Sequence, residues 1–222
     1  MAEIAPVPLR IDIVSDVVCP WCIIGYKQLQ KALAQRPGRF DITLRWHPFE
    51  LNSDMPEEGQ DLGEHMAQKY GATRDRSHAV RGRLVALGQS LGFHFDSGGQ
   101  RRMRNTFRAH QLLHWADEQG LQTELKLALF EAYFSRGEDV NDPEVLASVA
   151  ASVGLSPEAA REVLCDHRYA QTVREQQRQW LDRDVYAVPA FFFDDGYPVP
   201  GAQEPDTFLR LLDKIYQRKT PA

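Results

Sequence analysis

The first sixty residues alternate between two spacings of apolar positions. Residues 9–16 place apolar and polar side chains in turn, which predicts a strand that becomes more apolar as it enters a core. Apolar positions in residues 23–33 recur at helical spacing, and Pro37-Gly38 follows them. Residues 41–46 alternate again and predict a second strand. The opening is therefore strand, helix, strand.

The stretch from about residue 61 to residue 184 carries helical patterns and no convincing strand. Asp142-Pro143-Glu144 and Ser156-Pro157-Glu158 each place a capping residue, a proline and an acid where a helix begins. Gly120 can end the helix before it in the left-handed conformation. We therefore expect an all-helical block inserted into an α/β frame.

The frame resumes near the end of the chain. Residues 190–193 predict a short aromatic strand, and Asp194-Asp195-Gly196 is a hairpin signal. Residues 197–199 can return as a strand, which their proline limits to an edge or a short length. Residues 204–216 close the chain as an amphipathic helix. The expected class is α/β, with one discontinuous domain of residues 1–60 and 184–222 and a helical insertion domain of residues 61–183.

Composition and charge narrow the function classes. The chain has 222 residues, 43% hydrophobic and 26% charged, as in a globular protein. A formal net charge of −5 argues against a nucleic-acid partner, and we expect the basic cluster at residues 101–104 to form a solvated helix face. Residues 1–8 lack the pattern of a secretory signal, and no apolar run approaches the roughly 20 residues of a membrane span. We expect a cytoplasmic protein that binds neither nucleic acid nor membranes.

The motif Cys19-Pro20-Trp21-Cys22 lies where the first strand meets the helix. Unpaired amides and the positive dipole end of a helix N-terminus stabilise a thiolate. Pro20 suits the first turn because it has no amide hydrogen, and Cys22, three residues on, can close a disulfide with Cys19. We expect Cys19 to be accessible with a lowered pKa, and Cys22 to be buried with the higher pKa. Trp21 is expected to shape the surface against which a partner docks.

Two other interpretations of this pair stay open. Zinc normally takes four ligands, and Cys165 with His167 makes only a weak, distant fragment, so no metal site is predicted. The two cysteines could also be unrelated buried residues, but their position at the start of a helix favours redox chemistry. Cys165 follows two apolar residues on an amphipathic helix, and we expect it to be a small buried core residue.

Four segments in order resemble the DsbA-like thioredoxin superfamily, and in particular its cytoplasmic FrnE-like subfamily. The first segment is residues 15–25, around the cysteine motif. The others are Trp46–Asn52, Asn105–Leu112, and Val188–Phe192 leading to Gly201-Ala202-Gln203. The resemblance covers nearly the whole chain. It implies a thioredoxin-like fold with a large helical insertion.

The resemblance also implies neighbours for the cysteine pair. It predicts a cis peptide bond at Val188-Pro189, packed against the two sulfurs. It places Asn105 and His110 on an insertion helix that flanks the site, although a lone histidine there is more often a hydrogen-bonded structural residue. The candidates for a substrate groove are Asn105, His110, Phe49 and Gln203. The chain departs from the family at two positions, with Ala190 in place of a bulky residue and Pro200 in place of a serine.

The expected function is thiol–disulfide exchange with protein substrates through a redox-active Cys19-Cys22 disulfide. No tightly bound cofactor is expected, and glutathione is a candidate co-substrate. The superfamily also contains kappa-class glutathione transferases and 2-hydroxychromene-2-carboxylate isomerases, which typically carry a serine at the position of Cys19 and lack the second cysteine. A chaperone-like binding module is a third class, because the insertion could offer an apolar groove. The direction of electron flow, the substrates and the oligomeric state, a homodimer included, do not follow from the sequence.

Overall fold

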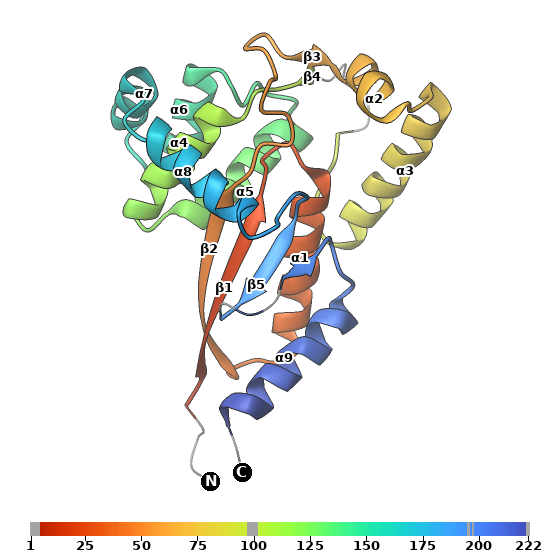
Figure 1. Cartoon of the computed structure of the whole chain (residues 1–222), viewed down its shortest axis with the longest axis vertical. Helices are drawn as coiled ribbons and strands as arrows, with labels where there is room; N and C mark the ends of the chain where they lie inside the picture. Colours follow the sequence, from red (N-terminus) through yellow and green to blue (C-terminus); the bar gives the residue numbers. More distant parts are fainter. Residues whose placement is uncertain (1–4, 97–101, 195, 197, 221–222) are drawn as a thin grey trace.

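A four-stranded sheet forms the centre of the molecule. The computed structural model describes residues 5–96, 102–194, 196 and 198–220 (Figure 1). The strand order is β2-β1-β5-β6, in which β1 and β2 are parallel and the remaining neighbours are antiparallel. The strands are β1 (Val7–Ser15), β2 (Phe40–Pro48), β5 (Ala190–Phe193) and β6 (Val199–Pro200).

Strand β1 is the buried centre of this sheet. Its last five residues are all buried, because β2 and β5 flank it and helices cover it. Ile11 faces Phe193 in the register with β5, and Leu9 faces Ile42 in the register with β2. The predicted alternation therefore belongs to a strand whose first half is partly solvated and whose second half enters the core. This arrangement brings the end of β1 to the middle of the molecule.

Two helices from opposite ends of the sequence pack together beside the sheet. These are α1 (Pro20–Ala34) and α9 (Pro205–Lys219) (Figure 1). Gly25 of α1 allows a close approach, since a Cβ atom there would lie 3.0 Å from the ring of Phe191 and 3.2 Å from the Cα of Ala202. Tight packing at Gly25 therefore fixes the position of α1 relative to β5 and to the segment that follows β6.

The segment between β2 and β5 is mainly helical, as expected. Its helices gather at the end of the sheet where β1 stops, and α5 and α8 contact β2 (Figure 1). Asp142 and Ser156 cap the helices that they were expected to begin. The helices are α2 (Leu62–Tyr70), α3 (Arg74–Ser90), α4 (Phe107–Glu118), α5 (Gln122–Phe130) with a π-helical turn at Glu131–Ser135, α6 (Pro143–Ser152), α7 (Pro157–Asp166) and α8 (Ala170–Leu181).

The expectation that this segment contains no strand is wrong in one detail. Two-residue strands β3 (Gln60–Asp61) and β4 (Arg102–Met103) pair antiparallel. Arg102 therefore lies on a strand and not on the helix face that we expected, while Arg101 is outside the described residues. Two residues are too few to produce a period-two pattern, so sequence periodicity cannot reveal such a pair.

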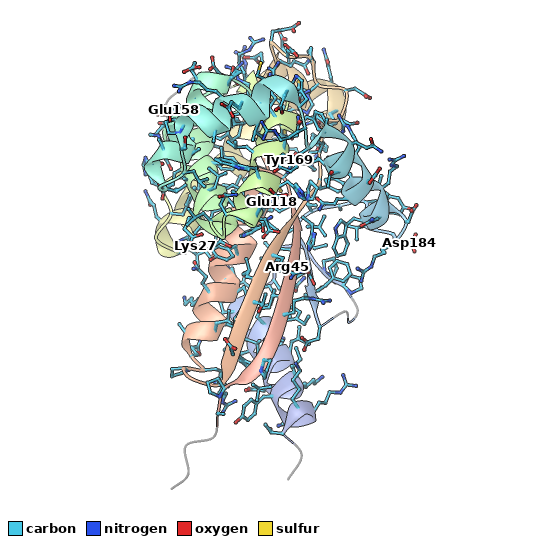
Figure 2. The ribbon with its side chains drawn as sticks, turned by 90° about the vertical axis from the view of Figure 1, so that its left-hand side faces the viewer. Lys27, Arg45, Glu118, Glu158, Tyr169 and Asp184 are labelled. Atoms are coloured by element: carbon cyan, nitrogen blue, oxygen red, sulfur yellow. The ribbon has the colours of Figure 1, made fainter. Side chains whose placement is uncertain are left out.

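Polar contacts hold the insertion helices to one another. The hydroxyl of Tyr169, just before α8, donates to Glu118 at the end of α4 at 2.5 Å (Figure 2). At the opposite end of the sheet, the predicted hairpin turn after β5 includes Asp194 and Gly196, and its other expected residues Asp195 and Tyr197 lie outside the described residues. No helix in the described part of the chain is long and apolar enough to cross a membrane.

Candidate active site

The two cysteines of the motif occupy the first turn of α1. Cys19 is the N-cap residue, with φ −90° and ψ 110°, and Pro20 is the first helical residue. The Cys19 amide donates to the Asp16 carbonyl at 3.2 Å, and the Cys22 amide donates to the Cys19 carbonyl at 3.1 Å. Both cysteines are free thiols in this structure. The turn after β1 therefore sets the two sulfurs at the N-terminus of the helix.

Both thiols are buried, which corrects the expectation that Cys19 is accessible. Cys19 is 3% exposed and Cys22 is fully buried, whereas Trp21 between them is 43% exposed. An N-cap side chain points away from the helix axis, and here it meets the loop before β5. The Cys19 thiol donates to the Val188 carbonyl oxygen at 3.7 Å.

The loop before β5 brings the second half of the chain to the cysteines. The peptide bond between Val188 and Pro189 is cis. The Pro189 carbonyl accepts a hydrogen bond from the Gly201 amide at 2.8 Å, which holds the segment after β6 beside this loop. Ala190 and Pro200, the two departures from the family pattern, are partners in the register of β5 and β6. The two unusual residues therefore lie next to each other in the sheet, where Ala190 directly follows the Val188-Pro189 bond and is buried.

The two thiols contact each other, and their pKa values move in opposite directions. The hydrogen bond with Cys22 and then burial raise the pKa of Cys19 well above its ordinary value. Burial also opposes ionisation of Cys22, but the Cys19 thiol, the Ser15 hydroxyl and the Lys126 ammonium together lower the pKa of Cys22. The expectation that Cys19 has the lowered pKa is therefore wrong. The N-terminus of α1 favours the thiolate of Cys19, but the Ser15 hydroxyl and the Lys126 ammonium favour the thiolate of Cys22.

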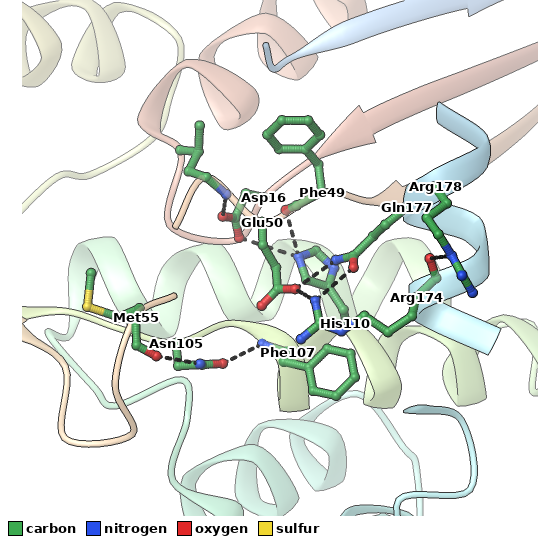
Figure 3. A network of polar contacts seen from close by, with 11 residues as sticks. Asp16, Phe49, Glu50, Met55, Asn105, Phe107, His110, Arg174, Gln177 and Arg178 are labelled. Atoms are coloured by element: carbon green, nitrogen blue, oxygen red, sulfur yellow. Dashed lines mark hydrogen bonds and ion pairs between the residues drawn. The ribbon is translucent and has the colours of Figure 1, made fainter. Parts of the chain in front are cut away.

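A buried carboxylate lies just before the motif. Asp16 is 1% exposed and accepts a hydrogen bond from the Leu51 amide at 2.8 Å. His110 of α4 places its Nε2 3.0 Å from the Phe49 carbonyl oxygen and 3.4 Å from Asp16 Oδ1 (Figure 3). Burial would raise the pKa of Asp16, but the contacts with His110 and Leu51 and the nearby Lys126 keep that pKa below its usual value.

The four candidate groove residues do not come together in one contact set. His110 is 2% exposed and meets Phe49 only through the Phe49 backbone. Asn105 lies before α4 and not on it, where its side chain bridges the Met55 carbonyl and the Phe107 amide (Figure 3). Gln203 donates to the Pro200 carbonyl. Asn105 and His110 thus hold neighbouring backbone in place.

Lys126 and Asp16 are site residues that the sequence analysis missed. Lys126 is 1% exposed on α5, and its Nζ lies 3.4 Å from the Ser15 carbonyl oxygen. A signal for Lys126 exists, because it stands among apolar residues in Leu125–Phe130 on the side of the helix that also carries buried Leu129 and Phe130. A charged side chain at such a position requires an internal partner.

Cys165 is exposed, which corrects the expectation of a buried core residue. Val163 and Leu164 before it are buried, and the helical rotation of about 100° per residue turns Cys165 outwards.

In the described part of the chain, no group of three or more histidine, cysteine or acidic side chains is arranged to hold a metal ion.

Comparison with known proteins identifies the family. Residues 10–213 match the DsbA-like thioredoxin domain, so the chain belongs to that family. A probable DsbA oxidoreductase from Streptomyces coelicolor is 32% identical in sequence, and its crystal structure superposes with a TM-score of 0.88. The match covers 96% of this chain and 92% of that protein. These likenesses agree with the fold and with the FrnE-like resemblance of the sequence.

Two more distant structures share the fold. A 2-hydroxychromene-2-carboxylate isomerase is 17% identical with a TM-score of 0.71, over 94% of this chain and 97% of the isomerase. The cytosolic disulfide reductase DsbM of Pseudomonas aeruginosa is 18% identical with a TM-score of 0.63, over 94% of this chain and 99% of DsbM, and it has also been solved with GSH. The family therefore supports oxidoreductase activity in general, and the fold also accommodates an isomerase.

Proposed function

We propose that this protein is a thiol–disulfide oxidoreductase that acts on protein substrates through Cys19 and Cys22. One observation carries the proposal, namely that both thiols share the first turn of α1 and that the Cys19 thiol faces the Val188 carbonyl next to Pro189. Each element of this arrangement serves exchange. The helix terminus stabilises negative charge, the spacing permits a disulfide, and a nearby backbone carbonyl offers a hydrogen bond to an extended substrate chain.

The exchange proceeds in two displacement steps. A proton moves from Cys19 to Cys22 between the contacting sulfurs, and the Cys19 thiolate attacks one sulfur of a substrate disulfide. That disulfide breaks, its other sulfur leaves as a thiolate and takes a proton from solvent, and a mixed disulfide forms. Cys22 then loses its proton and attacks Cys19, which releases the second substrate thiolate. The substrate gains two electrons and the cysteine pair loses two, and the reverse sequence oxidises a substrate.

The proposed docking surface surrounds the motif. Trp21 supplies an exposed apolar side chain, and the Val188-Pro189 loop supplies backbone beside Cys19. Phe49 and Gln203 flank this surface in the proposal. Asn105 and His110 support it from inside by the contacts described above.

Glutathione is the proposed small-molecule co-substrate, and the redox-active disulfide replaces any tightly bound cofactor. A structural relative named as a cytosolic disulfide reductase, solved with GSH, supports both this choice and a cytoplasmic location.

Trapping of the mixed disulfide tests the proposal. With Cys22→Ser, the second displacement cannot occur, so covalent complexes with substrate proteins should accumulate on a non-reducing gel and disappear with reductant. Cys19→Ser should trap few or none. Cys165→Ser should behave like the wild type, because Cys165 is exposed on α7, away from the motif in sequence. The assignment fails if Cys165→Ser abolishes turnover while Cys22→Ser traps nothing.

The alternative function is a glutathione-dependent isomerase or transferase, which the shared fold of the isomerase supports. Such an enzyme has no use for a resolving thiol, so Cys22→Ser would keep most of its activity and trap no proteins. Insulin reduction and oxidation of reduced, unfolded proteins, compared with conjugation of glutathione to a test electrophile, separate the two functions.

A further inference from the structure

Lys126 is completely enclosed on the inner side of the cysteine pair. Its ammonium lies 5.5 Å from the ring centre of Trp46 and 5.1 Å from that of Phe130, and it donates a hydrogen bond to the Ser15 carbonyl at 3.4 Å. Aromatic faces and one carbonyl replace only part of the hydration that an ammonium loses on burial. Burial therefore lowers the pKa of Lys126 to about 8.

Three acidic groups face Lys126 and oppose part of this effect. They are, in order of effect, Cys22, Asp16 and Cys19. His47 of β2 and His110 and His114 of α4 line the same small cavity as Lys126. The Asp16 carboxylate contacts His110 and accepts a hydrogen bond from the Leu51 amide. Of the acidic groups, Cys22 has the largest effect on the pKa of Lys126.

Resting on the proposed function, we propose that Lys126 is the charge and proton partner of Cys22 in the step that resolves the mixed disulfide. The helical insertion supplies it, since Lys126 lies on α5 whereas both cysteines lie on α1. Lys126 is a positioning residue in this role, because its ammonium is held by the Ser15 carbonyl beside the cysteine pair.

The proton balance of the step is simple. In the mixed disulfide, Cys22 is a neutral thiol, so one of the anions that hold a proton on Lys126 is missing and the amine form gains. The Cys22 proton passes to the Lys126 amine, and the thiolate and ammonium form a pair. The thiolate then attacks Cys19, the bond from Cys19 to the substrate breaks, and the substrate sulfur leaves as a thiolate that solvent protonates.

Ser15 connects the two groups. Its carbonyl accepts a hydrogen bond from Lys126. Its hydroxyl oxygen is buried and has no hydrogen-bond partner among the described residues, so the hydroxyl can turn towards a Cys22 thiolate, and it lowers the pKa of Cys22. A cavity of about 10 Å³ borders Lys126, His110, His114 and Gln122, and a volume of about this size holds one water molecule. His114 is 20% exposed at its side chain, so such a water gives the Lys126 proton a route to solvent.

Two successive releases of a coloured thiol test the proposal. The assay uses protein that carries Cys165→Ser, because the exposed Cys165 thiol would release the same coloured product. The reduced protein reacts with 5,5′-dithiobis(2-nitrobenzoate) first at Cys19, and attack by Cys22 then releases the second thiol. Lys126→Met should slow the second release about tenfold at pH 7 while changing the first by less than about threefold. It should also move the pH midpoint of the second release upwards, since burial then acts on Cys22 without the opposing charge. The matched control is Lys31→Met, which removes an exposed lysine of α1.

The equilibrium with glutathione gives an independent readout. The ammonium stabilises the thiolate of the reduced form and has no such partner in the disulfide form. Lys126→Met should therefore shift the equilibrium towards the disulfide about tenfold, which is a potential lower by about 30 mV. If this variant does not fold, the wild-type protein still tests the proposal. The proposal requires that the pH midpoint of the second release in the wild type lies below the ordinary cysteine pKa of about 8.5.

Three results would overturn the role of Lys126. They are an unchanged second release in Lys126→Met, equal slowing of both releases, or a wild-type midpoint at or above the ordinary value. Failure of the proposed function looks different. In that case, the wild type still closes its Cys19-Cys22 disulfide, and the rate of the second release still depends on Lys126. However, Cys22→Ser traps no protein, and the wild type does not reduce insulin.

Discussion

Trp21 stands at the surface while the residues that follow it in α1 are buried. Its side chain is 43% exposed, whereas Cys22 and Ile23 have no exposed surface. Tryptophan is the side chain that most often contributes strongly to protein interfaces, because it buries a large apolar area. A protein substrate that covers Trp21 would gain from that burial, and a small disulfide would not.

Trp21→Ala should therefore separate large from small substrates. We expect kcat/KM for insulin reduction to fall about tenfold, which corresponds to roughly 1.4 kcal/mol of lost contact energy. The reaction with a small aromatic disulfide should change by less than about twofold. The control is Ile42→Ala, because Ile42 is also an exposed apolar residue but lies on β2. Equal losses for both substrates would show that Trp21 acts on the thiols and not on docking.

At this scale, the sequence predicted the position of the two cysteines better than their surroundings. The spacing of Cys19 and Cys22 and their position before a helix follow from local patterns. The Cys19 thiol faces Val188, and the pKa of Cys22 is lowered by Lys126 in addition to the nearby Cys19 and Ser15. Val188 and Lys126 are both far away in sequence. Local patterns contain no information about such contacts. Cys165 was misjudged because neighbours in a helix sequence point to different sides.

At the scale of elements, α8 is tied to the end of β2 by one buried carboxylate. The Glu50 side chain is 2% exposed, and its Oε2 accepts from Arg174 and from Gln177, the latter at 3.0 Å (Figure 3). Arg174 also covers the ring of Phe107, with 3.8 Å between the guanidinium carbon and the ring centre. The contact thus joins the segment after β2, helix α8 and helix α4, and α4 is the helix that carries His110.

Removal of Arg174 should leave the Glu50 charge without its main partner. Arg174→Met should lower the free energy of unfolding by about 2 kcal/mol, less than the cost of breaking a fully buried pair because Arg174 is 42% exposed. Urea unfolding followed by circular dichroism measures this. Arg178→Met, on the same helix, should cost less than about 0.5 kcal/mol. Adding Glu50→Gln should recover part of the loss, and no recovery would mean that packing on Phe107 dominates.

The regular elements were largely predictable because their patterns are local. The strands at β1, β2 and β5 and the capped starts of α6 and α7 follow from alternation and capping residues. The order of the strands in the sheet was not predicted, since pairs such as Ile11 with Phe193 join segments that are distant in sequence. The β3–β4 pair had no signal, because each strand has two residues.

At the scale of the whole molecule, we expect two buried carboxylates, Asp12 and Asp16, to contribute to the loss of stability in acid. Burial would raise the pKa of Asp12 and of Asp16, but His47 and Arg10 for the former, and His110 and Leu51 for the latter, lower both pKa values. A carboxyl whose pKa is lower in the folded chain stabilises the fold above the unfolded value of about 3.9. That contribution is lost as pH falls through the folded pKa.

We therefore expect the free energy of unfolding to decrease steadily as pH is lowered from 5 to 3. Denaturant unfolding at half-unit pH steps measures the slope. Asp16→Asn should flatten this slope, because the variant has no proton to gain at that position. A slope that is unchanged in Asp16→Asn would assign the acid sensitivity to other carboxyls.

The distance along the chain between Cys19 and Val188 has a consequence during synthesis. The carbonyl that faces the Cys19 thiol comes 169 residues later. At translation rates of roughly 5–20 residues per second, the ribosome needs about 10–30 s to add that length. During this time, Cys19 and Cys22 leave the ribosome, but β5 has not yet been synthesised. Lys126 of α5 is also missing for the first part of this interval. The surroundings of the two cysteines are thus completed only after β5 has been synthesised.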